Sequence, residues 1–225
     1  MSDFNLEIEL CSAANPGSGE GWAGMIDSDV VYDEFGLPFI PARRVKGILR
    51  EMAEEVINAY EMSGMNSSKS WNAETLDKLF GKRGTAEAAE MSVRNAYLPE
   101  YESLRLWLEW AQLEASHLAT PENVITVFTT IRKQTKIEPK TGAAQDPSLR
   151  QIRVLKRGLK FCSRILLPSN DKYLIELFQE AVKVTRAFGG KRNRGLGKIR
   201  CQLNPLSNTS AAASAAANLL EAQNG

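Results

Sequence analysis

A loop near the C-terminus combines the residue types that bind phosphate. Its four glycines and four basic residues lie in the run Gly189-Gly190-Lys191-Arg192-Asn193-Arg194-Gly195-Leu196-Gly197-Lys198. Glycine allows close approach of the backbone, successive N–H groups form a concave anion site, and Lys and Arg add positive charge. No Lys-Ser or Lys-Thr closes the loop, and a strand rather than a helix is predicted to follow it, so it is neither a nucleotide P-loop nor a dinucleotide-binding loop. Residues 189–195 therefore predict contact with a phosphate-rich polymer.

Two further basic clusters point to nucleic acid. One consists of Arg43, Arg44, Lys46 and Arg50, with Gly47 inside it, and the other places nine basic and two acidic residues between positions 131 and 160. Residues 51–122 reverse the balance, with thirteen acidic and six basic residues, although the net charge of the chain is only +1. This segregation predicts one basic face for RNA or DNA and one acidic face for solvent or a basic neighbour. The alternative is that each cluster is a solvated surface.

Length and composition favour one cytoplasmic domain with insertions. The chain has 225 residues, 43% of them hydrophobic, and no apolar run long enough to cross a membrane. Its start resembles no secretory signal, and its three cysteines have no metal-like spacing, which favours reduced thiols. Residues 207–225 are rich in Ser and Ala and form a low-complexity tail.

Hydrophobic periodicity predicts the elements that position these clusters. Strands are expected over residues 4–10, 91–98 and 196–203, and strand-like sequence over 152–167. Helices are expected from 42 to about 63, over 72–80 with Asn72 as the cap, over 101–111 and over 171–188. The order approximates βαββαβ, so the fold class is predicted to be α+β with a ferredoxin-like arrangement, as in RNA-recognition modules.

Several segments together resemble one family. Ile26-Asp27, Ile40-Pro41 and Val45-Lys46-Gly47 are similar to the N-terminal signature of backbone subunits of type III CRISPR effector complexes, which belong to the RAMP superfamily. Leu79-Phe80-Gly81, the run 93–97 and the glycine-rich loop resemble the landmarks that follow, in the same order. The resemblance covers most of residues 26–203.

The resemblance implies an architecture and partners. It implies a ferredoxin-like palm over residues 1–206, with an inserted β-hairpin thumb near 132–151 and helical insertions. It also implies that copies stack with neighbouring RAMP subunits and other subunits of the complex along a guide crRNA, and that the guide pairs with a target RNA. Basic residues of the thumb, Lys136 and Arg150, join the RNA-binding set, and Trp22 is a candidate for stacking on a base or for packing at the sheet edge.

The same resemblance makes Asp27 the candidate catalytic residue, as the position at which cleaving members cut target RNA. Without it, Asp27 reads as a turn-capping residue near Ser28. Asp29, Asp33 and Glu20 are nearby carboxylates that could assist. The chain departs from the family pattern at Ala42-Arg43-Arg44, where Gly-Ser-Ser is frequent, and at residues 12–14, where a histidine is frequent.

The residue inventory restricts the chemistry. The only histidine is His117, which lies far from the loops, so acid–base catalysis by two histidines within one chain is excluded. Cleavage is expected to proceed by attack of the 2′-OH on the adjacent phosphate, with Asp27 orienting the 2′-OH or binding a divalent metal, for which Mg²⁺ is the expected ion. The chain is therefore predicted to be a metal-dependent endoribonuclease. The alternatives are a non-cleaving structural subunit, a standalone RNA-recognition module and a guide-processing ribonuclease, the last disfavoured by the missing histidines.

Overall fold

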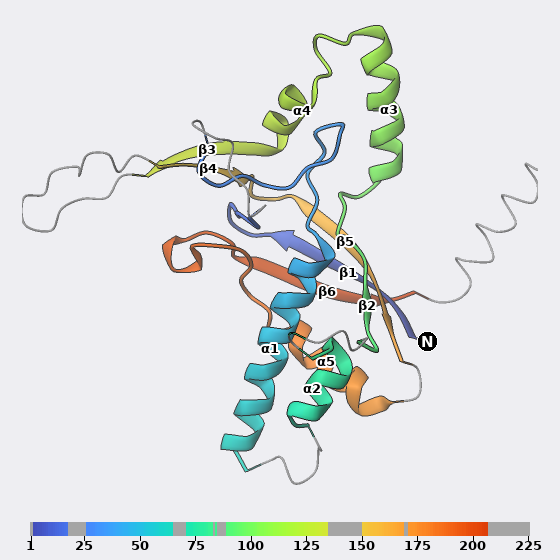
Figure 1. Ribbon diagram of the computed structural model, residues 1–225, viewed down its shortest axis with the longest axis vertical. Helices are drawn as coiled ribbons and strands as arrows, with labels where there is room; N and C mark the ends of the chain where they lie inside the picture. Colours follow the sequence, from blue (N-terminus) through green and yellow to red (C-terminus); the bar gives the residue numbers. More distant parts are fainter. Residues whose placement is uncertain are drawn as a thin grey trace, which may run out of the picture.

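The computed structural model describes residues 2–17, 26–64, 71–82, 84, 89–134, 150–168 and 171–206. Figure 1 shows a sheet with helices on one side and a two-stranded hairpin that projects from it. The strands are β1 (Ser2–Leu10), β2 (Ser92–Val93), β3 (Thr129–Gln134), β4 (Arg150–Leu155), β5 (Lys160–Leu167) and β6 (Ile199–Pro205). The α-helices are α1 (Ala42–Met62), α2 (Ala73–Phe80), α3 (Tyr101–Glu114), α4 (Pro121–Phe128) and α5 (Lys172–Val184), and Arg192–Arg194 form a short 3-10 turn.

The main sheet has the ferredoxin-like strand order. Its strands lie in the order β2-β5-β1-β6, and all neighbours are antiparallel. The first strand is thus central, between the third and fourth strands of the palm, and the second lies at an edge. Helix α1 precedes β2, helix α5 precedes β6, and the two helices pack against each other. The predicted α+β, ferredoxin-like palm is confirmed.

Alternation along β1 separates the core from an ionic outer face. Leu6, Ile8 and Leu10 are buried toward the helices, as a strand with a side-chain period of two requires. The residues between them point to the other face, where cross-strand ion pairs form: Asp3–Arg164, Glu7–Lys160 and Glu9–Arg200. No aromatic side chain lies on this face in β1, β5 or β6. These three strands therefore lack the aromatic platform that a standalone RNA-recognition module uses to stack bases, and Tyr97, bridged to Cys162, is engaged with the rings of Phe39 and Tyr101.

Helix α1 begins at a cap supplied by a distant residue. Its apolar positions, among them Val45 and Leu49, are buried against the sheet. Pro41 provides no side-chain cap, but Oδ1 of Asn95 accepts a hydrogen bond from the Ala42 N–H at 2.8 Å. Asn95 therefore fixes the first turn of α1, which carries two of the predicted RNA-binding arginines.

The hairpin β3–β4 corresponds to the predicted thumb. Its strands pair antiparallel from Thr129 opposite Leu155 to Gln134 opposite Arg150. The predicted thumb near 132–151 thus includes both strand ends, and residues 135–149, with Lys136, lie outside the described residues. The strand-like stretch 152–167 divides at a turn through Gly158, whose φ is +90°, and its halves β4 and β5 belong to different sheets.

The helical insertion α3–α4 exposes aromatic residues. Trp71 is a core residue that is 1% exposed, and its Nε1–H donates a hydrogen bond to the Tyr173 carbonyl at 3.1 Å. Trp107 and Trp110 on α3 are instead about 60% exposed, beside the exposed Leu106 and Leu113. Within the described part of the chain, no helix is both long and apolar enough to cross a membrane.

Candidate RNA-binding surface

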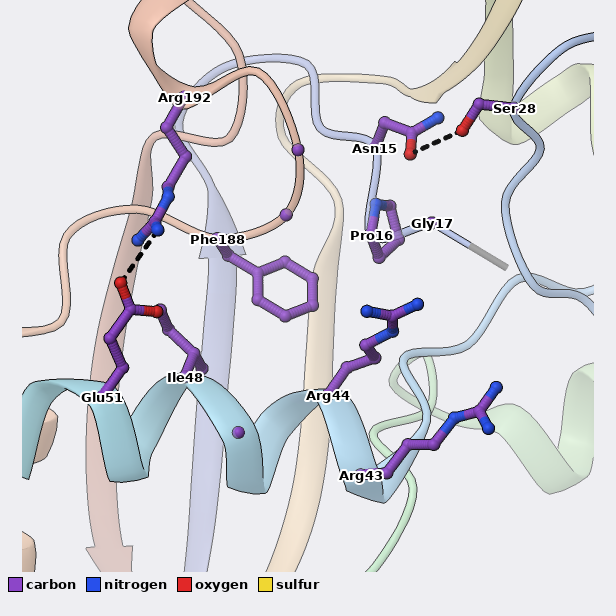
Figure 2. A pocket seen from close by; sticks show the side chains of 13 residues that line it. Asn15, Pro16, Gly17, Ser28, Arg43, Arg44, Ile48, Glu51, Phe188 and Arg192 are labelled. Atoms are coloured by element: carbon purple, nitrogen blue, oxygen red, sulfur yellow. Dashed lines mark hydrogen bonds and ion pairs between the residues drawn. The ribbon is translucent and has the colours of Figure 1, made fainter. Parts of the chain in front are cut away.

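The glycine-rich loop and the first turns of α1 form one pocket. It has a volume of about 520 Å³, and its walls combine four segments that are far apart in the sequence, one of them represented by Ser28. Helix α1 contributes Arg43, Arg44 and Gly47, the loop contributes Gly189, Gly190 and Arg192, and the turn after β1 contributes Asn15–Gly17. Figure 2 shows Arg44 and Phe188 on opposite sides of this space, with Pro16 and Gly17 nearby. The structure thus joins two of the three predicted basic clusters.

Two glycines of the loop are required by packing against the chain itself. Gly189 has a φ of +81°, and an added Cβ would collide with the Asn15 carbonyl oxygen. That oxygen also accepts a hydrogen bond from the Gly190 N–H at 2.9 Å. Gly197 has a φ of +75°, and a Cβ added there would likewise collide with the Phe188 carbonyl oxygen. At these two positions the close approach of protein backbone already requires glycine, and contact of the loop with phosphate stays a prediction.

Gly47 is different, because nothing in the protein requires it. An added Cβ at this position would meet no atom within 4 Å. Glycine inside an exposed helical turn costs about 1 kcal/mol relative to alanine. Gly47 leaves the pocket wall open without any packing need, which fits a surface that a ligand approaches closely.

The two arginines of the first turn of α1 face the pocket without acidic partners. Arg43 and Arg44 are both exposed, and among the described residues neither forms an ion pair. The first turn contains no acidic residue, so both charges add to the positive end of the helix dipole. Arg192 pairs with Glu51 at 2.9 Å and fastens the loop to α1. A bound phosphate would relieve the repulsion among the unpaired charges.

Lys46 and Arg50 do not line this pocket, and RNA contact by these two residues stays a prediction. The Arg50 side chain is 13% exposed and binds Asp77 of α2 at 2.6 Å, and its Nη1 donates to the Gly81 carbonyl. Lys46 is half-buried one turn earlier, where burial and the nearby Arg50 lower its pKa. The helical spacing of four residues does place them on one side of α1, but that side is turned toward α2.

Asp27 lies at the edge of the pocket, bonded to the thumb. Its N–H donates to the Gln151 carbonyl at 2.8 Å, and its Oδ2 accepts from the Gln151 N–H at 2.6 Å. Its neighbour Ser28 lines the pocket and donates to Oδ1 of Asn15 at 3.3 Å. Asp27 itself is exposed, and its Oδ1 accepts no hydrogen bond from any described residue. The carboxylate thus accepts a hydrogen bond from the backbone at the start of β4 and does not cap a turn near Ser28.

The other two aspartates of this segment have structural partners. Asp29 is 5% exposed, accepts from the Val30 N–H at 2.7 Å and pairs with Arg153 at 3.4 Å. Asp33 accepts from the Tyr101 hydroxyl at 2.7 Å and from backbone N–H groups of its own turn. Of these three aspartates, Asp27 alone presents a free carboxylate oxygen to solvent.

The second half of the glycine-rich loop lies near Asp27. Lys191 donates from Nζ to Oε1 of Gln134 at the end of β3, opposite Arg150. Burial, then Arg194 and Arg150, lower the Lys191 pKa, and Asp27 opposes them. Asn193, Arg194 and Gly195 are exposed in the same turn. The first part of the loop therefore lines the pocket, and the second part lies at the base of the thumb. The predicted stacking residue Trp22 lies outside the described residues.

The described residues do not by themselves form a metal centre. They contain no group of three His, Cys, Asp or Glu side chains placed to hold an ion. The exposed Oδ1 of Asp27 can supply one oxygen ligand, but Lys191, Arg150 and Arg194 lie close enough to oppose a cation there. Magnesium is commonly bound by one or two carboxylates together with substrate phosphates and water. The site therefore fits a Mg²⁺ ion only if Asp27 supplies one ligand and RNA phosphates and water supply the others.

Some residues of the site carry no recognisable sequence signal. Asn15 donates from Nδ2 to the Arg153 carbonyl at 2.7 Å and so joins the turn after β1 to the thumb. Gln134 and Gln151 hold Lys191 and Asp27 at the base of the thumb. Their roles depend on neighbours more than 50 positions away, which hydrophobic periodicity does not reveal. The only sequence signal at Asn15 is that it precedes Pro16 and Gly17, which together are typical of a turn.

Comparisons with known proteins agree with this architecture. The model of the RAMP superfamily matches residues 19–200. The chain is 25% identical over 187 residues to a protein of Methanocaldococcus jannaschii named CRISPR system Cms endoribonuclease Csm3, covering 79% of this chain and 68% of the relative. In fold it is similar to a chain of the type III-B Cmr-beta complex bound to cognate target RNA, with a TM-score of 0.66, 12% identity and coverage of 90% of this chain and 97% of the other. The apo state of that complex contains a similar chain, with a TM-score of 0.63, 14% identity and the same coverage. Since the family model spans most of its length, this chain belongs to the RAMP superfamily.

Proposed function

We propose that this chain is a backbone subunit of a type III CRISPR effector complex that holds guide crRNA and cleaves the paired target RNA at Asp27. The family membership and the Csm3 relative, whose name describes an endoribonuclease, support this assignment. The similar fold of a chain in a complex with cognate target RNA supports RNA and neighbouring subunits as partners.

The observation that carries the proposal is the position of Asp27 at the margin of the basic pocket. Ser28 lines the pocket, and Asp27 precedes it with one free carboxylate oxygen. A strand of RNA whose phosphates contact Arg43, Arg44 and the loop would pass this carboxylate. Contacts of this kind bind the backbone rather than the bases, so guide–target pairing would carry the sequence specificity.

The proposed chemistry is an in-line attack within the target strand. The 2′-oxygen forms a bond to phosphorus as the bond from phosphorus to the 5′-oxygen breaks, which leaves a 2′,3′-cyclic phosphate and a 5′-hydroxyl. Asp27 accepts a hydrogen bond from the 2′-OH and orients it, the 2′ proton passes to solvent, and the 5′-oxygen takes up a proton from solvent. Positioning and charge stabilisation contribute the greater part of such catalysis. A Mg²⁺ ion, held by RNA phosphates with Oδ1 of Asp27 as one ligand, would supply further neutralisation of phosphate charge.

A non-cleaving structural subunit is the second candidate. The paired hydrogen bonds between Asp27 and Gln151 favour it, because they give the aspartate a purely structural task at the base of the thumb. A standalone RNA-recognition module is not favoured, since the outward side chains of β1, β5 and β6 form ion pairs and include no aromatic residue.

Guide retention tests the RNA-binding part of the proposal. In complexes assembled with the double variant Arg43→Gln/Arg44→Gln, the amount of co-purifying guide RNA should fall at least about tenfold at moderate salt, because two phosphate contacts are lost. Arg105→Gln, on α3 and outside the three basic clusters, is the matched control and should leave guide RNA unchanged. Equal guide content in the double variant and the control would contradict the assignment of the pocket.

A further inference from the structure

Three cations from two distant segments converge beside Asp27. Lys191 and Arg194 come from the glycine-rich loop, and Arg150 begins β4. The Lys191 Nζ donates to Gln134, which pairs with Arg150 across the hairpin, and Gln151 holds Asp27 by two hydrogen bonds. These contacts place Asp27, Lys191 and Arg150 at the base of the thumb, and Arg194, three residues after Lys191, is close enough to act on the Lys191 ammonium.

The positive charge there exceeds the local negative charge. Burial lowers the Lys191 pKa, the guanidinium groups of Arg194 and Arg150 lower it further, and Asp27 is the acidic residue that acts against them. Among the described residues, neither Arg194 nor Arg150 forms an ion pair. Such a cluster is electrostatically incomplete without an anion.

The backbone at Lys191 has a conformation that glycine adopts more easily. Its φ is +59°, and Glu100 is the other non-glycine residue with positive φ among those described. The loop already uses glycine at three positions with positive φ, namely Gly189, Gly195 and Gly197. A lysine in a left-handed conformation, with its side chain directed at the thumb, is typical of a position held for function rather than for the fold.

This cluster is separate from the pocket on α1. Lys191 contacts the thumb, whereas the next residue, Arg192, turns to Glu51 of α1 and lines the pocket. The 3-10 turn Arg192–Arg194 carries the chain between the two places. One loop therefore contributes to two basic sites, the pocket on α1, where Glu51 pairs with Arg192, and the base of the thumb, where Asp27 is held by the backbone of Gln151.

We propose that Lys191, Arg194 and Arg150 form a second phosphodiester site around Asp27, which binds the attacked phosphate of the target strand while the pocket on α1 holds the guide. This inference rests on the proposed function and identifies the group that opposes the charge developing on the phosphate. Lys191 is the central member, because its ammonium donates a hydrogen bond to Gln134 and also interacts electrostatically with Asp27. It contacts a non-bridging oxygen that becomes more negative as the 2′-oxygen attacks.

The test uses assembled complexes that contain Lys191→Gln, Lys191→Gly or Lys191→Arg. Lys172→Gln, an exposed lysine on the first turn of α5, is the matched control. We expect unchanged guide RNA content, a fall of about 10- to 100-fold in single-turnover cleavage of a guide-paired target for the Gln and Gly variants, and partial recovery for Arg. The Gly variant suits the positive φ, so its thermal midpoint should stay equal to that of the wild type or rise, which separates loss of cleavage from loss of folding.

A sulfur substitution in the target reports on the contact itself. Replacing a non-bridging oxygen at the cut by sulfur should slow the wild-type complex more than it slows Lys191→Gln, because the variant has already lost the contact. An equal sulfur effect in both, unchanged cleavage in Lys191→Gln, or loss of guide RNA in step with cleavage would each overturn the second site. If Asp27→Asn leaves cleavage intact while Lys191→Gln lowers it, the proposed role of Asp27 fails instead, and the phosphate site remains.

Discussion

Three aspartates within seven residues show how the environment of each residue sets its role. Asp29 is buried against Arg153, and Asp33 holds the Tyr101 hydroxyl and its own turn. Asp27 is exposed, with Oδ2 bonded to Gln151 and Oδ1 free of partners among the described residues. The sequence alone offers all of them as candidates, because residue type and spacing do not reveal burial.

Removal of the Asp29 side chain should destabilise the fold. The Arg153 side chain is only 15% exposed, and Asp29→Ala removes the carboxylate that pairs with it. The same change removes the acceptor of the Val30 N–H. We expect a loss of about 3 kcal/mol in the free energy of unfolding, measured by chemical denaturation. Asp27→Asn, which keeps an acceptor oxygen for Gln151, is the comparison and should lose less than about 1 kcal/mol. Equal losses in the two variants would contradict the different roles assigned to them.

At the scale of elements, the rotational position of each residue around α1 decides which basic side chains line the pocket. Arg43, Arg44 and Gly47 lie on the side of α1 that faces the glycine-rich loop. Lys46 and Arg50 lie on the side that faces α2, where Asp77 and the end of that helix bind Arg50. Sequence reasoning located the cluster but not its phase, because the position of α2 is a tertiary fact.

Replacement of Gly47 should raise the stability of α1 and weaken RNA binding. Gly47→Ala adds a side chain where the protein leaves space, so the helix should gain about 1 kcal/mol, seen as a higher denaturation midpoint. The same methyl group narrows the wall of the pocket, so guide retention should fall severalfold. An alanine variant with higher stability and unchanged guide retention would show that RNA does not approach this wall closely.

At the scale of the whole molecule, local periodicity predicted the palm better than its insertions. The strand β1 and the helices α1, α2, α3 and α5 have regular apolar spacing or clear caps, and all of them were predicted. The helix α4 was not predicted, and the strand β3 was expected only through the thumb that the family resemblance implies, because together they cover only residues 121–134. The predicted strand 91–98 pairs with the sheet only at Ser92–Val93, followed by isolated bridges at Ala96 and Tyr97.

The candidate site was predictable where charge and glycine are concentrated in sequence. The glycine-rich loop and the arginines of α1 were found separately, and the structure joins them in one pocket. Asn15 and Asn95 were missed, since each acts through a hydrogen bond to a segment more than 50 residues away. The roles of several glycines also changed, because Gly189 and Gly197 accommodate neighbouring backbone.

Mapped cleavage of a guide-paired target RNA tests the central claim most directly. Complexes assembled with wild-type chain or with Asp27→Asn would be compared under single-turnover conditions, with Mg²⁺ and with EDTA, and the product ends identified. We predict that the wild type yields a specific cut with a 2′,3′-cyclic phosphate and a 5′-hydroxyl, and that the cut is lost in Asp27→Asn and in EDTA while guide content stays constant. An unchanged cut in Asp27→Asn would contradict this account and make the chain a scaffold for a nuclease in another subunit.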